Sequence, residues 1–326
     1  MGNLELGKEY IPADEHKHIE EMLDMMVPFL EEKYPPGETL RHFHPKMHGC
    51  LKAQFIVEDL EDKYKVGLFK TAKTYDAWVR FSNAPPNKQA DKRASGRGFA
   101  IKILDVAGDI IDDDPIGVKT QNFLMTTSPV LSPGHVANYR RAIKALVNGF
   151  PGNLPYILDP GNWRRLRLTL KFMKKHANLL EVPYFTGAPI AFGEDKAVKF
   201  SIEPQKSATS KMPRKPTDYF LRERLMADLV KGDVLFDFMI QEQQDPNKEL
   251  VEDTSCIWKT PFKKIATVKL LQQEFTNQER IIFGENLFFS PWQCLEEHRP
   301  LGGINRARRE VYRVLSDFRK QRNGVG

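Results

Sequence analysis

Hydrophobic residues recur at helical spacing near the start of the chain and at strand spacing after it. Over residues 13–33 the apolar side chains lie on one face of a predicted helix, with acidic residues between them. They are Ile19, Met22, Leu23 and Met26. This pattern predicts an N-terminal helix over 13–33, which Pro35 and Pro36 would end.

From about residue 49 to 125 the pattern changes to short β-rich stretches. They read GCLKAQFIVE, KVGLFK, AWVRFS, GRGFAIKIL, DIIDD and KTQNFLMT. Turn-forming stretches such as NAPPNK and VAGD separate them. The pattern predicts a meander of antiparallel strands. A closed barrel is its expected form, because closure leaves no unpaired strand edges.

Two helices are predicted within residues 133–180, divided by a loop rich in proline and glycine at 150–161. The second helix mixes leucines with basic residues, as do helices that pack by their leucines and helices that rest on anionic membranes. Its basic residues are Arg164, Arg165, Arg167, Lys171, Lys174 and Lys175. We take packing as the main expectation and keep peripheral membrane contact as the alternative.

Strand patterns return after these helices. They cover residues 188–203, 234–241 and 264–271. Barrel strands are therefore expected over about 49–125 and 188–271, and an arginine-rich helix over about 303–322 follows them. A block of strands that helices interrupt and that then resumes favours one α+β domain over residues 1–326.

The composition is that of an ordinary globular protein, with 41% hydrophobic and 28% charged residues among 326. The 49 basic and 43 acidic residues give a net charge of +6, which suits an anionic ligand or surface, and no motif that reads nucleic acid accompanies it. Cys50, Cys256 and Cys294 are too few and too widely spaced for a disulfide framework or a zinc ribbon. With no signal-peptide pattern and no run of about 18 apolar residues, we expect a cytoplasmic protein that does not span a membrane.

The C-terminal helix sets two arginines near one tyrosine. Arg308 precedes Tyr312 by four residues and Arg319 follows it by seven, so both lie on its side of a helix. A tyrosine binds iron only as phenolate, and the ordinary tyrosine pKa of about 10 keeps the proton on in neutral water. A guanidinium that donates to the oxygen favours the phenolate, which makes Tyr312 a candidate metal ligand. An ordinary tyrosine on a basic surface helix is the alternative.

Three of the eight histidines, His42, His44 and His48, lie close together in the sequence. Alternate strand residues face one side, so these imidazoles are candidates for a cupin-like metal site. Such a site also needs a carboxylate soon afterwards and a later histidine on a partner strand, and neither is evident.

The segment around His44 also resembles the distal haem segment of catalases. The matching residues are Arg41, His44, Lys46 and Gly49. Three further matches follow in the family's order. They are Val79-Arg80-Phe81-Ser82, then Arg97-Gly98-Phe99-Ala100-Ile101-Lys102, then Arg308-x-x-x-Tyr312 with Arg319, which is similar to the catalase proximal signature. The resemblance covers roughly residues 37–320.

The resemblance implies a catalase-like core, an antiparallel β-barrel with helices packed beside it, that binds haem b and its iron. It implies that Tyr312 is the proximal iron ligand and that Arg308 keeps it charged. Arg41, Arg80 and Arg319 would pair with the two haem propionates, because guanidinium groups bind carboxylates through paired hydrogen bonds.

On the distal side, the resemblance implies that His44 takes the proton of a hydroperoxide and hands it to the departing oxygen. Ser82 would fix the tautomer of His44 through a hydrogen bond, and Asn122 is the expected amide beside it. An ungapped alignment with the family would select Thr120 instead. The phenylalanine that lies over the haem in catalases has no clear counterpart, because Ser132 falls near that point. We therefore expect a wider pocket. Val314 stands where the proximal aspartate of catalases is expected.

The chain has no room for the flanking domains of full-length catalases, so it looks like the minimal catalase-related haem proteins. Some of these are peroxidases, and others are catalase-like allene oxide synthases that act on fatty-acid hydroperoxides. We expect haem-dependent cleavage of the O–O bond of hydrogen peroxide or an organic (lipid) hydroperoxide, with peroxidase-like activity favoured over fast dismutation. A non-catalytic haem carrier or sensor is the alternative, and a homo-oligomer is compatible with both.

Overall fold

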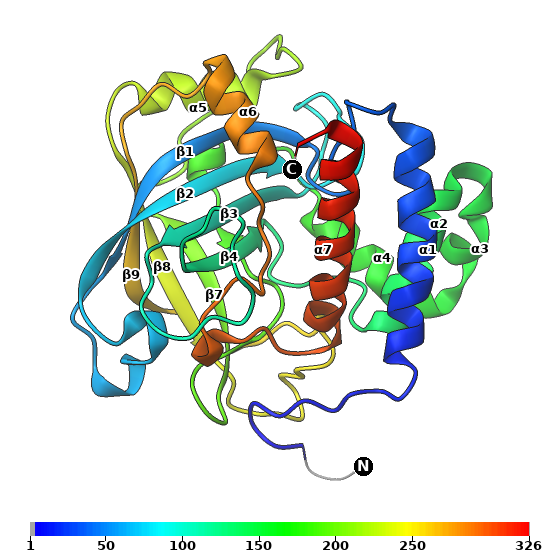
Figure 1. Ribbon diagram of the computed structural model, residues 1–326, viewed down its shortest axis with the longest axis horizontal. Helices are drawn as coiled ribbons and strands as arrows, with labels where there is room; N and C mark the ends of the chain where they lie inside the picture. The colour runs from blue at the N-terminus through cyan, green and yellow to red at the C-terminus, as the bar shows by residue number, and fades with distance from the viewer. Residues whose placement is uncertain (1–3, 326) are drawn as a thin grey trace.

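An antiparallel β-barrel forms the centre of the protein, and most helices pack on one side of it (Figure 1). The computed structural model describes residues 4–325. The strands are β1 (Lys46–Val57), β2 (Lys73–Asn83), β3 (Arg97–Leu104), β4 (Thr120–Thr126), β5 (Tyr184–Phe185), β6 (Ile190–Ala191), β7 (Ala197–Pro204), β8 (Val234–Glu242) and β9 (Lys263–Leu270). The helices are α1 (Glu15–Lys33), α2 (Val136–Gly152), α3 (Leu154–Leu158), α4 (Pro160–Phe172), α5 (Phe220–Leu229), α6 (Gln278–Asn286) and α7 (Gly303–Asn323).

The barrel is closed by β5, which has only two residues. The strands are ordered β5-β4-β3-β2-β1-β9-β8-β7, and β5 pairs with β4 on one side and with β7 on the other. Eight strands thus form a closed antiparallel ring, and β6 makes a short hairpin with β7. This confirms the predicted α+β fold with an antiparallel barrel core and flanking helices.

Alternation along β2 sends apolar side chains into the barrel and polar side chains outward. Val79 and Phe81 belong to the barrel core, whereas Arg80 and Ser82 lie on the other face of the strand. Both polar residues are nevertheless buried. The outer face of β2 must therefore be covered by other elements, and the site lies under that cover.

Two stretches that were predicted as strands have other structures. KVGLFK contains a 3-10 turn, Gly67–Phe69, because Gly67 adopts a φ of 51° that a strand does not allow. This turn buries Phe69 in the barrel core. DIIDD pairs only through Ile110, which forms an isolated bridge with Leu295.

The helices confirm the prediction over 13–33 and revise the middle of the chain. The predicted loop at 150–161 contains the short helix α3. α4 ends at Phe172 rather than near residue 180. Two residues later, Lys174 forms an extended backbone bridge with Ser95, which a helix would not allow.

α5 and α6 have no counterpart among the elements predicted from the sequence. α5 buries Leu221, Leu225 and Leu229, which recur every four residues and so carry a readable helical pattern. α6 buries only Gly284, which gives no such pattern. Its one clear signal is Asn277, whose side chain caps the first turn.

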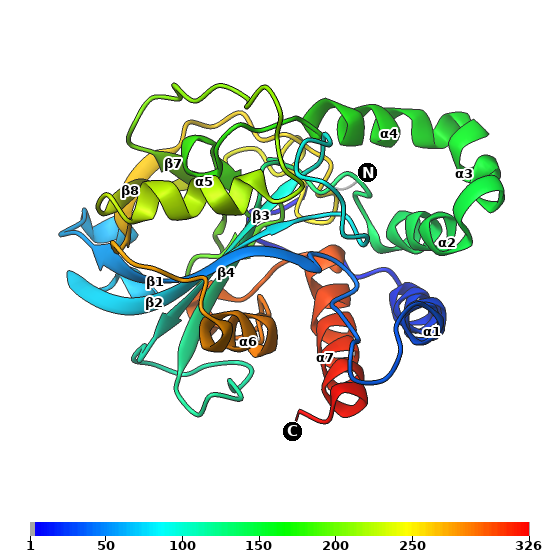
Figure 2. The ribbon, with the colours of Figure 1, turned by 90° about the horizontal axis from the view of Figure 1, so that it is seen from above.

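α7 lies beside the barrel, and α1 and α2 lie beyond it (Figures 1 and 2). α1 contacts both α2 and α7. Apolar residues of the three helices form a second, smaller core. It contains Ile19, Met22, Met26, Val136, Ile143, Ala307 and Val311. Among residues 4–325, no helix combines the length and the apolar character needed to cross a membrane.

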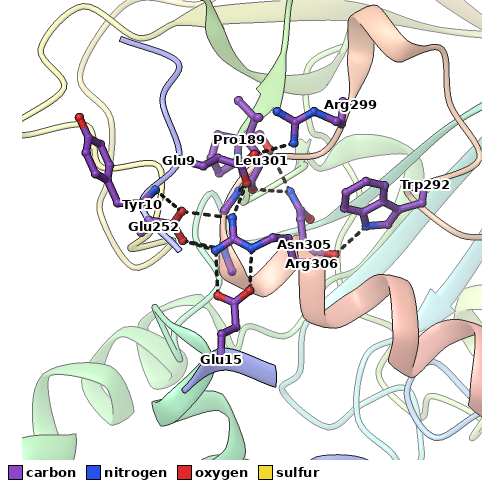
Figure 3. Close-up of polar contacts among 12 residues, drawn as sticks. Glu9, Tyr10, Glu15, Pro189, Glu252, Trp292, Arg299, Leu301, Asn305 and Arg306 are labelled. Carbon is purple, nitrogen blue, oxygen red and sulfur yellow. Dashed lines mark hydrogen bonds and ion pairs between the residues drawn. The ribbon is translucent and has the colours of Figure 1, made fainter. Parts of the chain in front are cut away.

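The start of α7 is fixed by Arg306, which contacts three carboxylates (Figure 3). Its Nε donates to Glu15 over 2.6 Å and its Nη2 donates to Glu252 over 2.9 Å. Its Nη1 donates to Glu9, which also accepts a hydrogen bond from Arg299. The N-terminal segment, α1 and the loop after β8 are thereby tied to α7.

Replacing Arg306 with glutamine is expected to lower the free energy of unfolding by about 3 kcal/mol or more, because three partly buried carboxylates lose their shared positive charge. Urea denaturation followed by circular dichroism measures this loss. Arg313→Gln on the same helix is the matched control, because Arg313 is exposed and pairs with Glu310 at the surface. We expect the control within about 0.5 kcal/mol of the unmodified protein. Equal losses in both variants would contradict the role of Arg306.

Candidate functional site

A cavity of about 630 Å³ lies between the outer face of the barrel and the helices beside it. One wall comes from β2, β3 and β4, and the other comes from α7, α1 and α2. Seven of the predicted site residues line it: Arg41, His44, Arg80, Ser82, Arg308, Tyr312 and Arg319. The rest of the lining is largely apolar, so charged groups in the cavity interact under weak screening.

His44 is held by three contacts in the loop between α1 and β1. Its ring Nδ1 lies 2.9 Å from Ser82 Oγ. Its backbone N–H donates to the Ala84 carbonyl over 3.3 Å, and its own carbonyl accepts from Arg80 Nη2 over 3.1 Å. The φ of His44 is 58°, in the left-handed region that few residues other than glycine adopt. Such backbone strain persists only where neighbours enforce it, and it is concentrated at functional sites.

Gly98 makes room for the contact between His44 and Ser82. β2 and β3 pair so that Ser82 stands opposite Gly98. A Cβ atom on Gly98 would lie 2.5 Å from His44 Nδ1 and 2.7 Å from Ser82 Oγ. The pair therefore requires glycine at this position. Thr126 of β4 stands opposite Gly98 and also lines the cavity.

The imidazole of His44 is uncharged at neutral pH. Burial, together with the guanidinium groups of Arg80, Arg308 and Arg41, lowers the pKa of His44 to about 3. With Nδ1 at the Ser82 hydroxyl, Nε2 is the nitrogen that can exchange a proton with a ligand. The pair can therefore act as an oriented base inside the cavity.

Tyr312 enters the cavity from α7 with an arginine beside its oxygen. Arg308 Nε donates to the Tyr312 hydroxyl over 3.3 Å, so the contact expected from their spacing is present. Asn305 Oδ1 accepts from Arg308 Nη1 over 3.0 Å and orients the guanidinium. Tyr139 of α2 packs in the same apolar cluster. Burial raises the pKa of Tyr139 and the nearby Tyr312 raises it further, so Tyr139 keeps its proton.

Three arginines meet around Glu285 of α6. Arg41 Nη1 lies 3.0 Å and Arg80 Nη2 lies 3.5 Å from the same carboxylate oxygen of Glu285. Arg319 Nη1 donates to the backbone carbonyl of Glu285 over 2.7 Å. Burial alone would raise the pKa of Glu285, but Arg80 and Arg41 outweigh it and hold the pKa below its ordinary value. Glu285 is therefore ionised.

This cluster has more positive than negative charge, since two guanidinium groups contact the one carboxylate and a third, that of Arg319, lies on the backbone carbonyl of the same residue. Burial lowers the pKa of Arg41 well below its ordinary value, and the nearby Arg80 and Arg319 lower it further. Arg80 is 3% exposed, and its Nε is buried without a hydrogen-bond partner in the described chain. The two excess charges match the two propionates of haem. The residues present therefore fit that group, with the phenol of Tyr312 as a candidate iron ligand.

The structure does not bring Asn122 to this site, which corrects the expectation that it lies beside His44. Asn122 stands opposite Lys102, farther along the barrel than the cavity wall. Its amide donates to Gln293 Oε1 over 2.6 Å and to the Ser290 carbonyl over 3.2 Å. Both hydrogen bonds hold the Asn122 amide against the segment 290–293, which covers this part of the barrel.

Other residues of the catalase-like motifs support the barrel wall from behind. Lys46 Nζ lies 2.7 Å from a carboxylate oxygen of Asp91. Arg97 donates to Asn83 and, over 2.9 Å, to the carbonyl of Asp91. These buried contacts fix the ends of β1, β2 and β3, which carry the loop of His44.

The three clustered histidines do not form a metal site. The His42 ring packs between Phe29 and Phe43, with centroids 5.4 and 4.6 Å away. His48 is buried with its Nε2 2.7 Å from Asn83 Oδ1. Within residues 4–325, no three histidine, cysteine or carboxylate side chains gather as a metal site would require. The cupin-like alternative is therefore wrong.

The end of α6 and the residues after it form a cavity wall that was not predicted from the sequence. Glu285, Phe288 and Phe289 line or border the cavity, and the Leu287 carbonyl accepts from Arg41 Nη2 over 2.6 Å. Two adjacent phenylalanines are only a weak signal for such a wall. No motif points to Glu285, because its partners lie far away in the sequence.

Two solved catalase structures have the same fold as this chain. A fungal catalase matches with a TM-score of 0.70 at 15% identity, over 100% of this chain and 68% of the catalase. Catalase A from Saccharomyces cerevisiae matches with a TM-score of 0.69 at 14% identity, over 98% of this chain and 67% of the catalase. No protein-family model and no curated protein matches the sequence. At these identities the likeness establishes the fold.

Replacing Gly98 with alanine is expected to separate His44 from Ser82 and to lower the free energy of unfolding by about 1 to 3 kcal/mol, because the added methyl group overlaps both side chains. Denaturant titration measures the stability, and imidazole ¹⁵N chemical shifts report the hydrogen bond. Gly96→Ala is the matched control, since its Cβ would meet only Ala84 at 3.3 Å. An unchanged His44 signal in Gly98→Ala would contradict the packing argument.

Proposed function

We propose that this protein binds haem b in the cavity and cleaves the O–O bond of peroxides. The observation that carries the proposal is the cluster of three arginines at Glu285, two on its carboxylate and one on its backbone carbonyl, together with a phenol on α7 that has its own arginine donor. Tyr312 would hold the iron, and Arg41, Arg80 and Arg319 would hold the propionates. When bound, haem supplies the redox-active iron needed for peroxide chemistry.

The residues of the chain supply the proton transfer. Neutral His44 takes the proton of the hydroperoxide on Nε2 and returns it to the oxygen that leaves. Ser82, at 2.9 Å from Nδ1, keeps the ring in the orientation and tautomer that this transfer needs. The largely apolar lining lowers the screening of charges along the proton-transfer path.

Organic hydroperoxides are the substrate class that we favour over hydrogen peroxide. Ser132, which falls near the point where catalases carry a phenylalanine, lines the cavity, and Thr169 donates to its Oγ over 2.7 Å. Two small hydroxyl side chains leave a wider opening than a phenylalanine would. The surrounding apolar residues suit an alkyl chain.

Tyr312→Phe is expected to lose the Soret spectrum of a phenolate-ligated haem, because phenylalanine offers no oxygen to iron. His44→Ala is expected to keep haem binding and to lose peroxide cleavage by roughly 10²- to 10⁴-fold, because only the proton transfer is removed. Absorption spectra of the haem-reconstituted variants and peroxide consumption measure the two effects.

Tyr139→Phe is the matched control for Tyr312→Phe. Tyr139 lines the same cavity, but within the described residues no guanidinium group donates a hydrogen bond to its hydroxyl as Arg308 does to that of Tyr312. Its Soret spectrum should match that of the unmodified protein. A His44→Ala variant with full activity would support the rival function, a haem carrier or sensor that does not cleave peroxides.

Glu285→Gln is expected to destabilise the haem-free protein by about 1 to 3 kcal/mol and the haem-loaded protein by less, because propionates would replace the missing charge. By linkage, the variant should then bind haem more tightly than the unmodified protein. Thermal unfolding with and without haem, and haem titration, measure both quantities. Glu279→Gln, also on α6, is the control. Weaker haem binding by Glu285→Gln would contradict the expected charge balance.

A further inference from the structure

One segment of the chain carries more positive charge than the whole protein. Residues 136–180, which contain α2, α3 and α4, hold nine lysines and arginines and one carboxylate, Asp159. Their net charge is +8, whereas the whole chain carries +6, so the other residues together carry −2. We call residues 136–180 the basic arm. It arches away from the barrel, with α3 at its far end (Figure 2).

The basic arm also exposes large apolar side chains. Seven of the 18 exposed large hydrophobic residues in the described chain lie between Phe150 and Met173. Phe150 is 81% exposed, Leu158 is 67% exposed and Leu170 is 70% exposed. α3 buries none of its residues, and α4 buries only Asn162. A concentration of apolar surface of this kind marks a contact site.

Apolar and basic side chains share one face of α4. Trp163 and Leu170 are seven residues apart, close to two helical turns, so they point in nearly the same direction. Arg167 and Lys171 follow Trp163 by four and eight residues, so they lie beside this apolar line. Exposed apolar side chains flanked by lysines and arginines are one pattern of helices that lie in the interface of anionic membranes.

The basic arm reaches the cavity as well as the surface. Leu146 of α2 and Thr169 and Phe172 of α4 line the cavity, as does Met173 after α4. A surface in contact with α4 is therefore separated from the cavity by the thickness of one helix. An apolar ligand that leaves such a surface has a short route to His44.

We infer that the basic arm docks on the surface of an anionic phospholipid bilayer. Phe150, Leu158 and Leu170 enter the boundary between headgroups and acyl chains, and the lysines and arginines face the lipid phosphates and carboxylates. A second copy of the chain does not fit, because two arms of +8 repel each other. A nucleic acid would match the charge but would leave the apolar side chains in water.

Docking places the cavity beside membrane-borne lipid hydroperoxides, which would then be the substrate of the enzyme. This second part rests on the proposed haem function. The docking itself does not, and it is measured on protein without haem.

Co-sedimentation with vesicles of phosphatidylcholine, with and without phosphatidylserine, tests the docking. The haem-free full chain should bind only the mixed vesicles, and added salt should release it. Combined Lys171→Gln, Lys174→Gln and Lys175→Gln should weaken binding on the order of 10²-fold, since each exposed charge contributes about fivefold. Arg164 and Arg165 are unsuitable, because they contact Ser255 and the Pro133 carbonyl of the protein body.

Combined Lys63→Gln, Lys70→Gln and Lys73→Gln is the matched control, because it removes three exposed lysines outside the basic arm, between the end of β1 and the start of β2. It should bind as the unmodified protein does. Combined Phe150→Ser, Leu158→Ser and Leu170→Ser should also weaken binding while leaving the charge unchanged. Equal binding by the two lysine variants would overturn the inference. Retained binding by the serine variant, or equal affinity for a polynucleotide, would also overturn it.

The substrate part is tested by turnover of a fatty-acid hydroperoxide carried in mixed vesicles, beside turnover of hydrogen peroxide. The triple lysine variant at 171, 174 and 175 should lose the first activity and keep the second. If vesicles bind normally but neither peroxide reacts, the proposed haem function fails and the docking stands. Equal loss of both activities would overturn the delivery role of the basic arm.

Discussion

The alternation of side chains along β2 is the constraint on which the rest of the structure depends. Val79 and Phe81 fill the barrel, so Arg80 and Ser82 necessarily point out of it. A buried guanidinium on the outside of a barrel requires both a cover and an anion. α7, α1 and the segment after α6 provide the cover, and Glu285 provides one negative charge. The cavity is the space between that cover and the barrel.

Glu285 gives the arginine cluster a defined charge in the absence of a ligand. Without it, Arg41, Arg80 and Arg319 would face one another across an apolar space with no counter-charge, at high electrostatic cost. With it, the cluster has one negative charge among its three positive ones and keeps two positive charges unmatched. A ligand with two acidic groups, such as the proposed haem, would neutralise both of them. Under that proposal, the same side chain contributes to folding and to ligand choice.

Much of the site could be predicted because residues that meet there are close together in the sequence. Arg308 and Tyr312 are four residues apart on one helix, so their contact follows from helical geometry alone. Glu285 could not be predicted, since it lies 244 residues from Arg41 and meets it only in the folded barrel. Asn122 was misplaced for a related reason. Its face of β4 follows from the sequence, but its level along the barrel depends on strand register, which places Thr126 opposite Gly98.

The two-residue strand β5 has a consequence for how the barrel responds to a ligand. A single residue pair, Thr126 with Phe185, joins β5 to β4, and two pairs join it to β7. Amide hydrogen exchange by local opening is fastest where so few ladder bonds hold neighbouring strands. Thr126 and Thr186, on either side of this junction, both line the cavity. A ligand that binds only the closed ring protects these amides and makes the barrel harder to open. With such a ligand, the slowest-exchanging form of the protein is the one with its cavity filled.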